Sequence, residues 1–202
     1  MDWYALKVFY NKVFDFEEQM RRRGIESYFP VRREEVKGEA YLRFRREMAL
    51  NPGGDPLGNR YVFEEPKLYK RIPLISSMMF IRCEEEDVPS VRKDIEGRGF
   101  IYMNADWTAP ARIPEREMTA FRLVADSGAS GLQFFSDDPI TRFKAGARVR
   151  VKEGPLKGAE GYIKRIKKDR RLVVAIAGVV AIATTYIPPS ELEIVEETED
   201  QA

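Results

Sequence analysis

The first half of the chain alternates short apolar runs with patterns of helical spacing. Trp3 to Phe9 carries aromatic and branched side chains, which favour a half-buried strand. Apolar positions then recur at helical spacing from Asn11, a good N-cap, to Gly24, with three arginines in the last turn. The apolar runs Tyr28 to Val36 and Leu74 to Arg82 predict a second strand and a central third strand.

Further helix and strand patterns complete this half. Asp87 to Ile95 predicts a short helix, and Gly99 to Met103 predicts a strand. A brief strand from Ala111 to Ile113 precedes a helix that Pro114 opens and Ala125 ends. The order βαββαββα predicts an α+β sandwich, in which the helices cover one face of a largely antiparallel sheet.

The stretch from Lys37 to Arg71 fits neither pattern. It mixes charges with a cluster of helix and strand breakers between Asn51 and Gly58, which is too dense for the interior of either element. We therefore expect an extended hairpin or a partly mobile loop there. Three arginines in this insertion, next to aromatic side chains, form a candidate contact for DNA or RNA phosphates: Arg43, Arg45 and Arg46.

The pattern changes after residue 125. Asp126 to Pro139 is rich in Ser and Gly, which is typical of a flexible linker at a domain boundary. Closely spaced short strands then predict a small all-β barrel. These strands are Ala147 to Lys152, Gly158 to Ile166, Leu172 to Ile176, Val180 to Ile187 and Leu192 to Val195.

The charge is unevenly distributed along the second half. Residues 142–171 hold twelve bases and three acids, a local net charge of +9, although the whole chain carries only +1. This segment is a candidate for binding nucleic acid, but a solvated hairpin turn at Asp169 would have the same composition. The candidate nucleic-acid contacts within this segment are Lys164, Arg165, Lys167 and Lys168. Six acids and no base between Glu191 and Asp200 predict a solvated tail.

The composition argues against several classes of protein. The single cysteine, Cys83, cannot form an internal disulfide or a cysteine cluster for zinc. The chain has no histidine, which removes the commonest general base and metal ligand, so we expect neither an enzyme nor a bound cofactor. Without a long apolar run or a signal-peptide pattern at the start, we expect a cytoplasmic protein that does not contact membranes.

A recognisable motif lies in the second half. Phe143-Lys144-Ala145-Gly146, Val149 to Leu156 and Gly161-Tyr162-Ile163 together resemble a KOW motif. Physically, Gly154-Pro155 is expected to turn the chain, and Gly161 to mark a close backbone approach in the returning strand. KOW barrels also occur in ribosomal proteins, so this motif by itself leaves the function open.

The first half of the chain narrows the choice of protein family. Trp3-Tyr4, Pro73-Leu74-Ile75 and Gly99-Phe100-Ile101 resemble, in order and spacing, the N-terminal domain of the NusG family of transcription elongation factors. The sequence from Ile72 to Ile81 is similar to that of specialised paralogues of the UpxY type. The resemblance implies an N-terminal (NGN) domain at 1–125 with an insertion at 37–71, a linker at 126–140, a KOW (SH3-like) barrel at 141–196 and an acidic tail at 197–202.

The resemblance also implies a function for the N-terminal domain. In the family, an apolar patch on this domain packs on the clamp helices of the β′ subunit of RNA polymerase. The positions that match are Trp3, Tyr4, Ile75, Met78 and Phe80. The resemblance implies a monomeric, non-enzymatic factor that promotes processive transcription. Binding to the clamp helices requires an exposed apolar surface at these positions. Ordinary sheet core is the competing interpretation of the same aromatic side chains.

The barrel in this family presents aromatic residues to Rho or to a ribosomal small-subunit protein. The matching positions here, Leu156, Ala159 and Val179, are not aromatic, which favours an antiterminator with a different partner. The alternative from another class is a ribosome- or RNA-associated KOW protein, in which the segment of charge +9 is the main binding surface.

Overall fold

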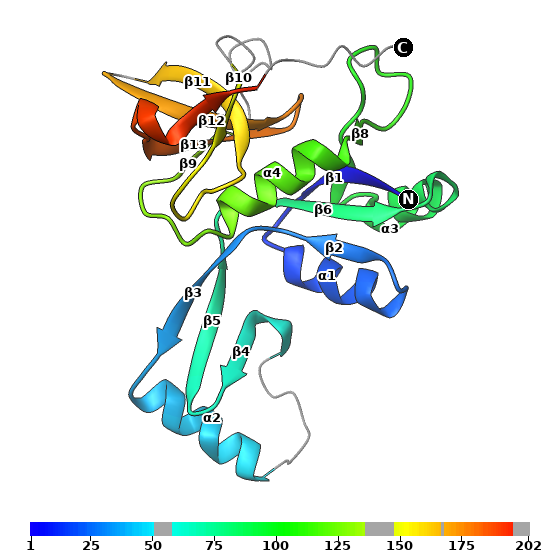
Figure 1. Cartoon of the computed structure of the whole chain (residues 1–202). Helices are drawn as coiled ribbons and strands as arrows, with labels where there is room; N and C mark the ends of the chain where they lie inside the picture. Colours follow the sequence, from blue (N-terminus) through cyan, green and yellow to red (C-terminus); the bar gives the residue numbers. More distant parts are fainter. Residues whose placement is uncertain (51–57, 136–147, 167, 196–202) are drawn as a thin grey trace.

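The computed structural model describes residues 1–50, 58–135, 148–166 and 168–195 (Figure 1). Three sheets and four α-helices lie in these ranges. The helices are α1 (Val13–Arg22), α2 (Glu39–Leu50), α3 (Val88–Ile95) and α4 (Glu115–Ala125). The segment Phe143 to Gly146 of the KOW-like motif, residue Lys167 and the acidic tail at 197–202 lie outside the described residues.

The central sheet is antiparallel and contains the first strand of the chain. Its order is β2 (Glu26–Tyr28), β6 (Met78–Cys83), β1 (Asp2–Val8) and β7 (Gly99–Ile101), and β8 (Arg112–Ile113) also pairs with β1. Alternate side chains of β1 point to opposite faces. Trp3 and Ala5 pack with α4, whereas Leu6 and Val8 pack with α1 and α3. The expected α+β sandwich is present, but helices cover both faces of the sheet and not one.

Several predicted boundaries in this region were wrong. The run from Tyr28 to Val36 is divided between two sheets, because Pro30 cannot donate a ladder hydrogen bond between β2 and β3 (Val31–Val36). The central strand β6 begins only at Met78, after Ser77 at a positive φ of 62°. Asn11 does not cap α1, since it has φ 53° and the helix follows Lys12 without a side-chain cap.

The insertion is folded, contrary to the expectation of a loop or simple hairpin. It forms the sheet β3, β5 (Lys67–Pro73) and β4 (Tyr61–Glu64), covered by α2. We call residues 31–50 and 58–73 the arm, because they project away from the rest of the protein (Figure 1). Phe44 of α2 packs on Phe63 with ring centroids 5.1 Å apart, and Leu68 is buried beside them. This small apolar contact stabilises a helix in which Phe44 is the one buried residue.

The C-terminal sheet has six strands. Their order is β14 (Leu192–Ile194), β10 (Arg148–Val151), β11 (Glu160–Ile166), β12 (Asp169–Ile176), β13 (Val180–Tyr186) and β9 (Gln133–Phe135). All five strands predicted after the linker are confirmed, and β9 is an additional strand inside the predicted linker. No ladder joins β9 to β14 within the described residues, so the expected closed barrel is not what these strands form.

Two glycine positions in the KOW-like motif behave as predicted. Gly154 has φ 79° in the turn between β10 and β11, a conformation that favours glycine. A Cβ at Gly161 would lie 2.4 Å from the backbone oxygen of Val173, so only glycine allows β11 and β12 to approach this closely.

Candidate functional site

Four of the five residues matched to polymerase contacts lie in one apolar cluster. Trp3, Met78 and Phe80 project from the same face of the central sheet, and Ile75 joins them from the loop before β6. Tyr4 points to the opposite face, among α1 and α3. Met79 also faces that way, so the prediction that Met78 and Met79 occupy opposite faces is confirmed.

These side chains are buried. Ile75 is 6% exposed, and Met78 and Phe80 are fully covered. The sequence-based expectation of an exposed apolar surface at these positions is therefore wrong for this arrangement of the chain. Whether they contact a partner depends on what covers them.

Helix α4 provides part of the cover. The ring of Phe121 packs on Phe80 with centroids 5.4 Å apart. Trp3 donates a hydrogen bond from Nε1 to Glu115 Oε2 at 3.1 Å, and the guanidinium of Arg122 lies 5.6 Å from the Trp3 ring. Aromatic, hydrogen-bond and cation–π contacts thus fix α4 to the sheet.

A second aromatic contact secures the end of α4. Tyr28 donates a hydrogen bond from its hydroxyl to Asp126 Oδ1 at 2.8 Å, and Arg122 lies 4.9 Å from its ring. Burial raises the pKa of the Tyr28 hydroxyl far above its usual value of 10, and the negative charge of Asp126 raises it further. Tyr28 therefore stays protonated as a donor, which keeps α4 attached to β2.

The C-terminal sheet packs on the other side of α4 (Figure 1). The backbone nitrogen of Ala177 donates to Glu117 Oε2 at 3.1 Å, and a Cβ at Gly158 would lie 3.9 Å from the Leu123 side chain. A cavity of about 170 Å³ remains between α4 and strands β10 to β12, lined in part by Arg148 and Glu160. The contact between the two regions is partly polar and incompletely filled.

The positions matched to partner contacts of the KOW domain belong to the same cluster. Leu156, Ala159 and Val179 are buried together with Trp3 and Phe80 in one continuous apolar core. The two surfaces that the family resemblance implied are therefore joined here, with α4 between them.

The arginines of α2 lie on the projecting arm. Arg43 pairs with Glu47 at 3.0 Å, and Arg45 lies 5.8 Å from the Phe63 ring and 3.8 Å from Glu65. Arg46 is exposed. These bases are thus presented on a folded helix away from the central sheet, where phosphate groups could reach them.

The bases of the C-terminal sheet meet across the hairpin of β11 and β12. Lys164 pairs in register with Arg171, and Arg165 pairs with Arg170. The turn was predicted at Asp169, but this residue is the first of β12 and pairs with Ile166. Like charges directly opposite each other repel. Asp169 offsets part of this charge through an ion pair with Arg171 at 3.6 Å, and the hairpin keeps an excess of bases.

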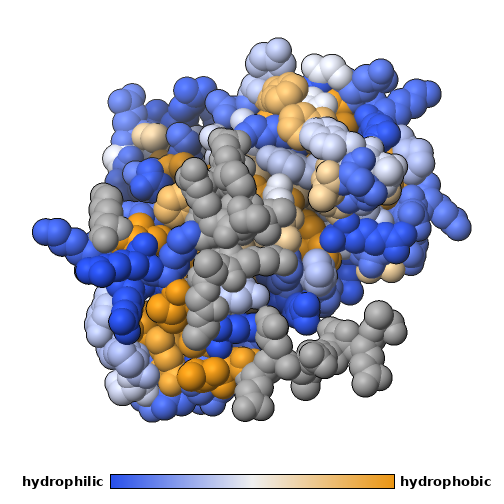
Figure 2. Space-filling model, turned by 90° about the horizontal axis from the view of Figure 1, so that it is seen from above, coloured by the Kyte–Doolittle hydropathy of each residue, from blue (hydrophilic) through white to orange (hydrophobic). Residues whose placement is uncertain are grey.

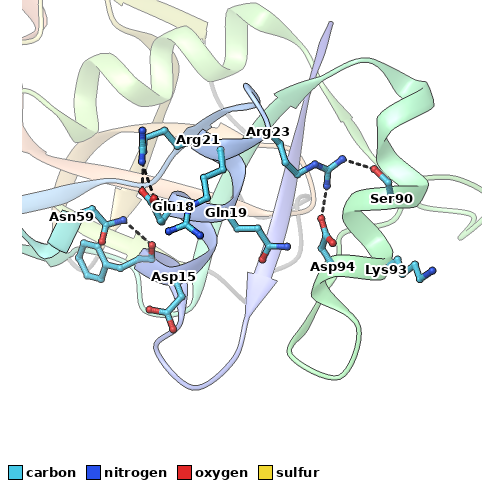
Figure 3. Close-up of a pocket in the computed structure, with 11 residues that line it drawn as sticks. Asp15, Glu18, Gln19, Arg21, Arg23, Asn59, Ser90, Lys93 and Asp94 are labelled. Carbon is cyan, nitrogen blue, oxygen red and sulfur yellow. Dashed lines mark hydrogen bonds and ion pairs between the residues drawn. The ribbon is translucent and has the colours of Figure 1, made fainter.

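A wide groove of about 960 Å³ lies between α1 and α3 and is lined mainly by charged side chains (Figure 3). Arg21 and Arg22 both bond to Glu18, and Arg23 bonds to Asp94 and Ser90. Hydrogen bonds hold the pKa of the Glu18 carboxyl at about 2; the bond from Arg21 has the largest effect and the bond from Arg22 the next largest. The guanidinium groups of this groove are therefore already paired.

Sequence analysis missed a surface of aromatic side chains at the open edge of the central sheet. Phe9, Tyr10, Phe100 and Trp107 are all exposed there, and we call this group the aromatic surface. Phe9 and Phe100 were assigned to ordinary strands, and the exposure of an edge strand is not visible in a single sequence. On the face seen in Figure 2, apolar side chains also reach the surface in separate patches among charged ones.

The described ranges lack two features. No helix in them is long and apolar enough to cross a membrane. The same ranges contain no group of three or more acidic or cysteine side chains placed to hold a metal ion.

The antiparallel central sheet, its helices and the C-terminal strands form a two-part fold, and comparison with known proteins gives the family. The family model described as "Transcription termination factor nusG" matches residues 1–122. Because this match covers more than half of the chain, the chain belongs to the NusG family of non-enzymatic transcription factors, which act on RNA polymerase.

Other comparisons add little detail. A solved structure described as "Domain interaction in Thermotoga maritima NusG" is 18% identical to the chain and has a TM-score of 0.41. The alignment covers 96% of this chain and 97% of that one. No curated protein matches the chain.

Proposed function

We propose that this chain is a cytoplasmic, non-enzymatic elongation factor that binds the β′ clamp helices of RNA polymerase and acts as a specialised antiterminator. The match of residues 1–122 to the NusG family carries the proposal. The proposed contact is the sheet face that bears Trp3, Met78 and Phe80, with Ile75 at its edge and Tyr4 behind it as support.

Polymerase binding then requires part of the cover to move. The proposed polymerase contacts lie in the same buried apolar core as the proposed partner contacts of the C-terminal sheet. These partner contacts are Leu156, Ala159 and Val179. Separation of the C-terminal sheet from α4 would expose the partner contacts, and the polymerase contacts become accessible once α4 also moves from the central sheet, where Phe121 covers Phe80. The hydrogen bond at Glu117 and the cavity beside Ala120 support such a separation, since this part of the contact is not filled by apolar side chains.

The proposed C-terminal partner is a protein that accepts an aliphatic surface. Leu156, Ala159 and Val179 offer no aromatic ring, so an antitermination partner fits better than Rho, and a ribosomal small-subunit protein is a second possibility. The bases of α2 and of the β11–β12 hairpin are proposed to contact DNA or RNA beside the polymerase.

Retention of purified RNA polymerase by the immobilised full chain tests this function. Ala120→Glu places a charge in the contact between α4 and the C-terminal sheet and should increase retention by opening it. Thr119→Glu, on the exposed side of the same helix, is the matched control and should leave retention unchanged. Met78→Ala added to Ala120→Glu should reduce retention again, with folding checked by circular dichroism.

A ribosome- or RNA-associated KOW protein is the second candidate. The observation that favours it is the cross-strand pairing of bases in the β11–β12 hairpin. If no variant retains polymerase, while Arg165→Ala and Arg170→Ala abolish binding to ribosomal RNA, this second function replaces the first.

A further inference from the structure

A tyrosine of the central sheet carries a buried hydroxyl without a hydrogen-bond partner. Tyr4 of β1 is only 1% exposed. Within the described ranges, no donor or acceptor lies within hydrogen-bond distance of its hydroxyl oxygen. Burial raises the pKa of this hydroxyl above its usual value of 10, and the charge of Asp2 raises it further, so the group keeps its proton at neutral pH. A buried donor that lacks an acceptor is costly and requires an explanation.

Tyr4 lines a pocket of about 270 Å³, which we call the Tyr4 pocket. Three elements meet there, since Tyr4 comes from β1, Arg112 from β8 and Val88 from the start of α3. The pocket lies on the face of the central sheet opposite to Met78 and Phe80. Its volume is near the lower end for ligand pockets, so it fits a small molecule and not a polymer.

Much of the lining of the Tyr4 pocket is apolar. Val88, Pro89 and Pro110 contribute side chains that neither donate nor accept hydrogen bonds, and a proline also lacks the backbone N–H. Val88 and Pro89 belong to α3, whereas Pro110 pairs with Met103 just before β8. A ligand between these elements therefore needs an apolar body, and its polar group has to meet the remaining lining residues.

The charged residues of the lining are Glu85, Arg92 and Arg112. Arg112 donates to Glu85 and also pairs with Asp2 at 3.6 Å, so these three groups offset one another. Arg92 donates a hydrogen bond to the sulfur of Met103 at 3.2 Å, and sulfur is a weak acceptor. Among the described residues, Arg92 thus has no carboxylate partner. The pocket combines a free hydroxyl donor with a guanidinium group that lacks an anion.

We propose that the Tyr4 pocket binds a small monocarboxylate with an apolar body. The Tyr4 hydroxyl and the Arg92 guanidinium donate to the carboxylate, and the body of the ligand packs on Val88, Pro89 and Pro110. Hydrogen bonds to an ionised acceptor are stronger than those to a neutral one. A neutral ligand would satisfy Tyr4 but leave Arg92 without a counter-charge, and a cation would be repelled by Arg92.

Titration of the full chain followed by NMR tests the proposal directly. The probes are benzoate, phenylacetate and hexanoate, which share a carboxylate and differ in the shape of the apolar body. At least one of them should cause saturable shifts of the backbone amide signals of Tyr4, Val88, Arg92 and Arg112. Phenylacetamide has nearly the shape of phenylacetate without its charge and should bind at least about 10-fold more weakly than the acid.

Removal of the hydroxyl should affect binding and stability in opposite directions. Tyr4→Phe should weaken binding of the carboxylate about 10- to 100-fold, the equivalent of one lost hydrogen bond to a charged group. Without ligand, the same variant should unfold at an equal or higher temperature, because a buried donor without an acceptor is removed. Tyr186→Phe, which removes an exposed hydroxyl from β13, is the matched control and should change neither quantity.

The charge of Arg92 is tested separately. Arg92→Gln should reduce the preference for phenylacetate over phenylacetamide, since the carboxylate loses its counter-charge while the amide does not. Lys93→Gln removes a base from the adjacent position of α3 that does not line the Tyr4 pocket, and it should leave this preference unchanged. Circular dichroism checks that each variant is folded.

Three outcomes would overturn the proposal. The first is the absence of saturable shifts with all three carboxylates. The second is equal affinity for phenylacetate and phenylacetamide, which would exclude recognition of the charge. The third is unchanged binding together with a lower unfolding temperature in Tyr4→Phe, which would give the hydroxyl a purely structural role. These measurements use the chain without polymerase, so their failure leaves the proposed function as it stands.

Discussion

Arg71 and Glu17 form a two-pronged ion pair at the base of the arm. Both guanidinium Nη atoms donate to the carboxylate, each at 2.7 Å, and the side chains are only 17% and 20% exposed. Arg71 also donates to the backbone oxygen of Asn59 and lies 5.2 Å from the Phe29 ring. The pair connects β5 with α1 and so fixes the direction in which the arm projects from the central sheet.

Loss of this pair should loosen the arm. Arg71→Met leaves the Glu17 carboxylate partly buried without its charged partner, so we expect the free energy of unfolding to fall by about 1–3 kcal/mol. Urea unfolding measures the loss, and limited proteolysis should cut the arm faster. Arg33→Met, which breaks the exposed pair with Glu64, is the control and should cost less than about 0.5 kcal/mol. Equal losses in both variants would contradict this role of Arg71.

Ionisation of Cys83 should reduce stability at high pH. Burial raises the pKa of this thiol from 9.0 to about 11, with a smaller contribution from Asp87. The folded-state pKa lies above the unfolded value, so the stabilisation is complete below pH 9 and is lost as the pH rises towards 11. Urea unfolding should show that the wild type loses about 1–2 kcal/mol more than Cys83→Ala between pH 8 and pH 10.5. Parallel pH profiles would contradict the assignment.

Substitution of Gly161 should disrupt the C-terminal sheet. A methyl group there would meet the Val173 backbone oxygen at 2.4 Å, and a backbone atom cannot move aside as a flexible side chain can. We expect Gly161→Ala to cost about 1–3 kcal/mol or more in thermal or urea unfolding. Lys157→Ala, in the exposed turn before β11, should be close to neutral, and a neutral Gly161→Ala would show that the strands can separate without cost.

The arginines of α2 should contribute to binding duplex DNA. Replacing Arg43, Arg45 and Arg46 with alanine should weaken non-specific binding and make the dependence of log K on log salt less steep by up to about 2–3 units. Filter binding or anisotropy across a salt series measures both quantities. Removal of Arg43 is expected to matter least, because Glu47 already neutralises it. An unchanged slope would exclude these side chains from the contact.

Much of the fold was predictable because its strands and helices bury regular apolar faces. The nearly continuous apolar runs of β1 and β6 and the helical spacing in α3 and α4 follow from local burial, and turn residues mark the ends of the C-terminal strands. Helix α2 could not be found this way, since Phe44 is its only buried residue and the breaker cluster follows it closely. Its contacts are with Phe63 of β4 and with the turn at Glu65 and Pro66, which follow it only after the breaker cluster.

The candidate sites were less predictable than the fold. Family resemblance selected Phe80 and Val179 as partner contacts, which stays a prediction, because exposure depends on which surfaces pack together. The pairing of α4 with both sheets decides that exposure, and no local pattern in the chain contains it. The aromatic surface was missed for the related reason that Phe100 and Trp107 become neighbours only when β7 forms the sheet edge.

The strand β9 limits how far the two halves of the protein can separate. Because Gln133 to Phe135 hydrogen-bonds to β13, only residues 126–132 remain as a tether after α4. Fully stretched, a tether of this length spans about 25 Å. With α4 anchored on polymerase, the C-terminal sheet would search a small sphere, which gives it a high local concentration near the enzyme and restricts it to partners docked beside the same site.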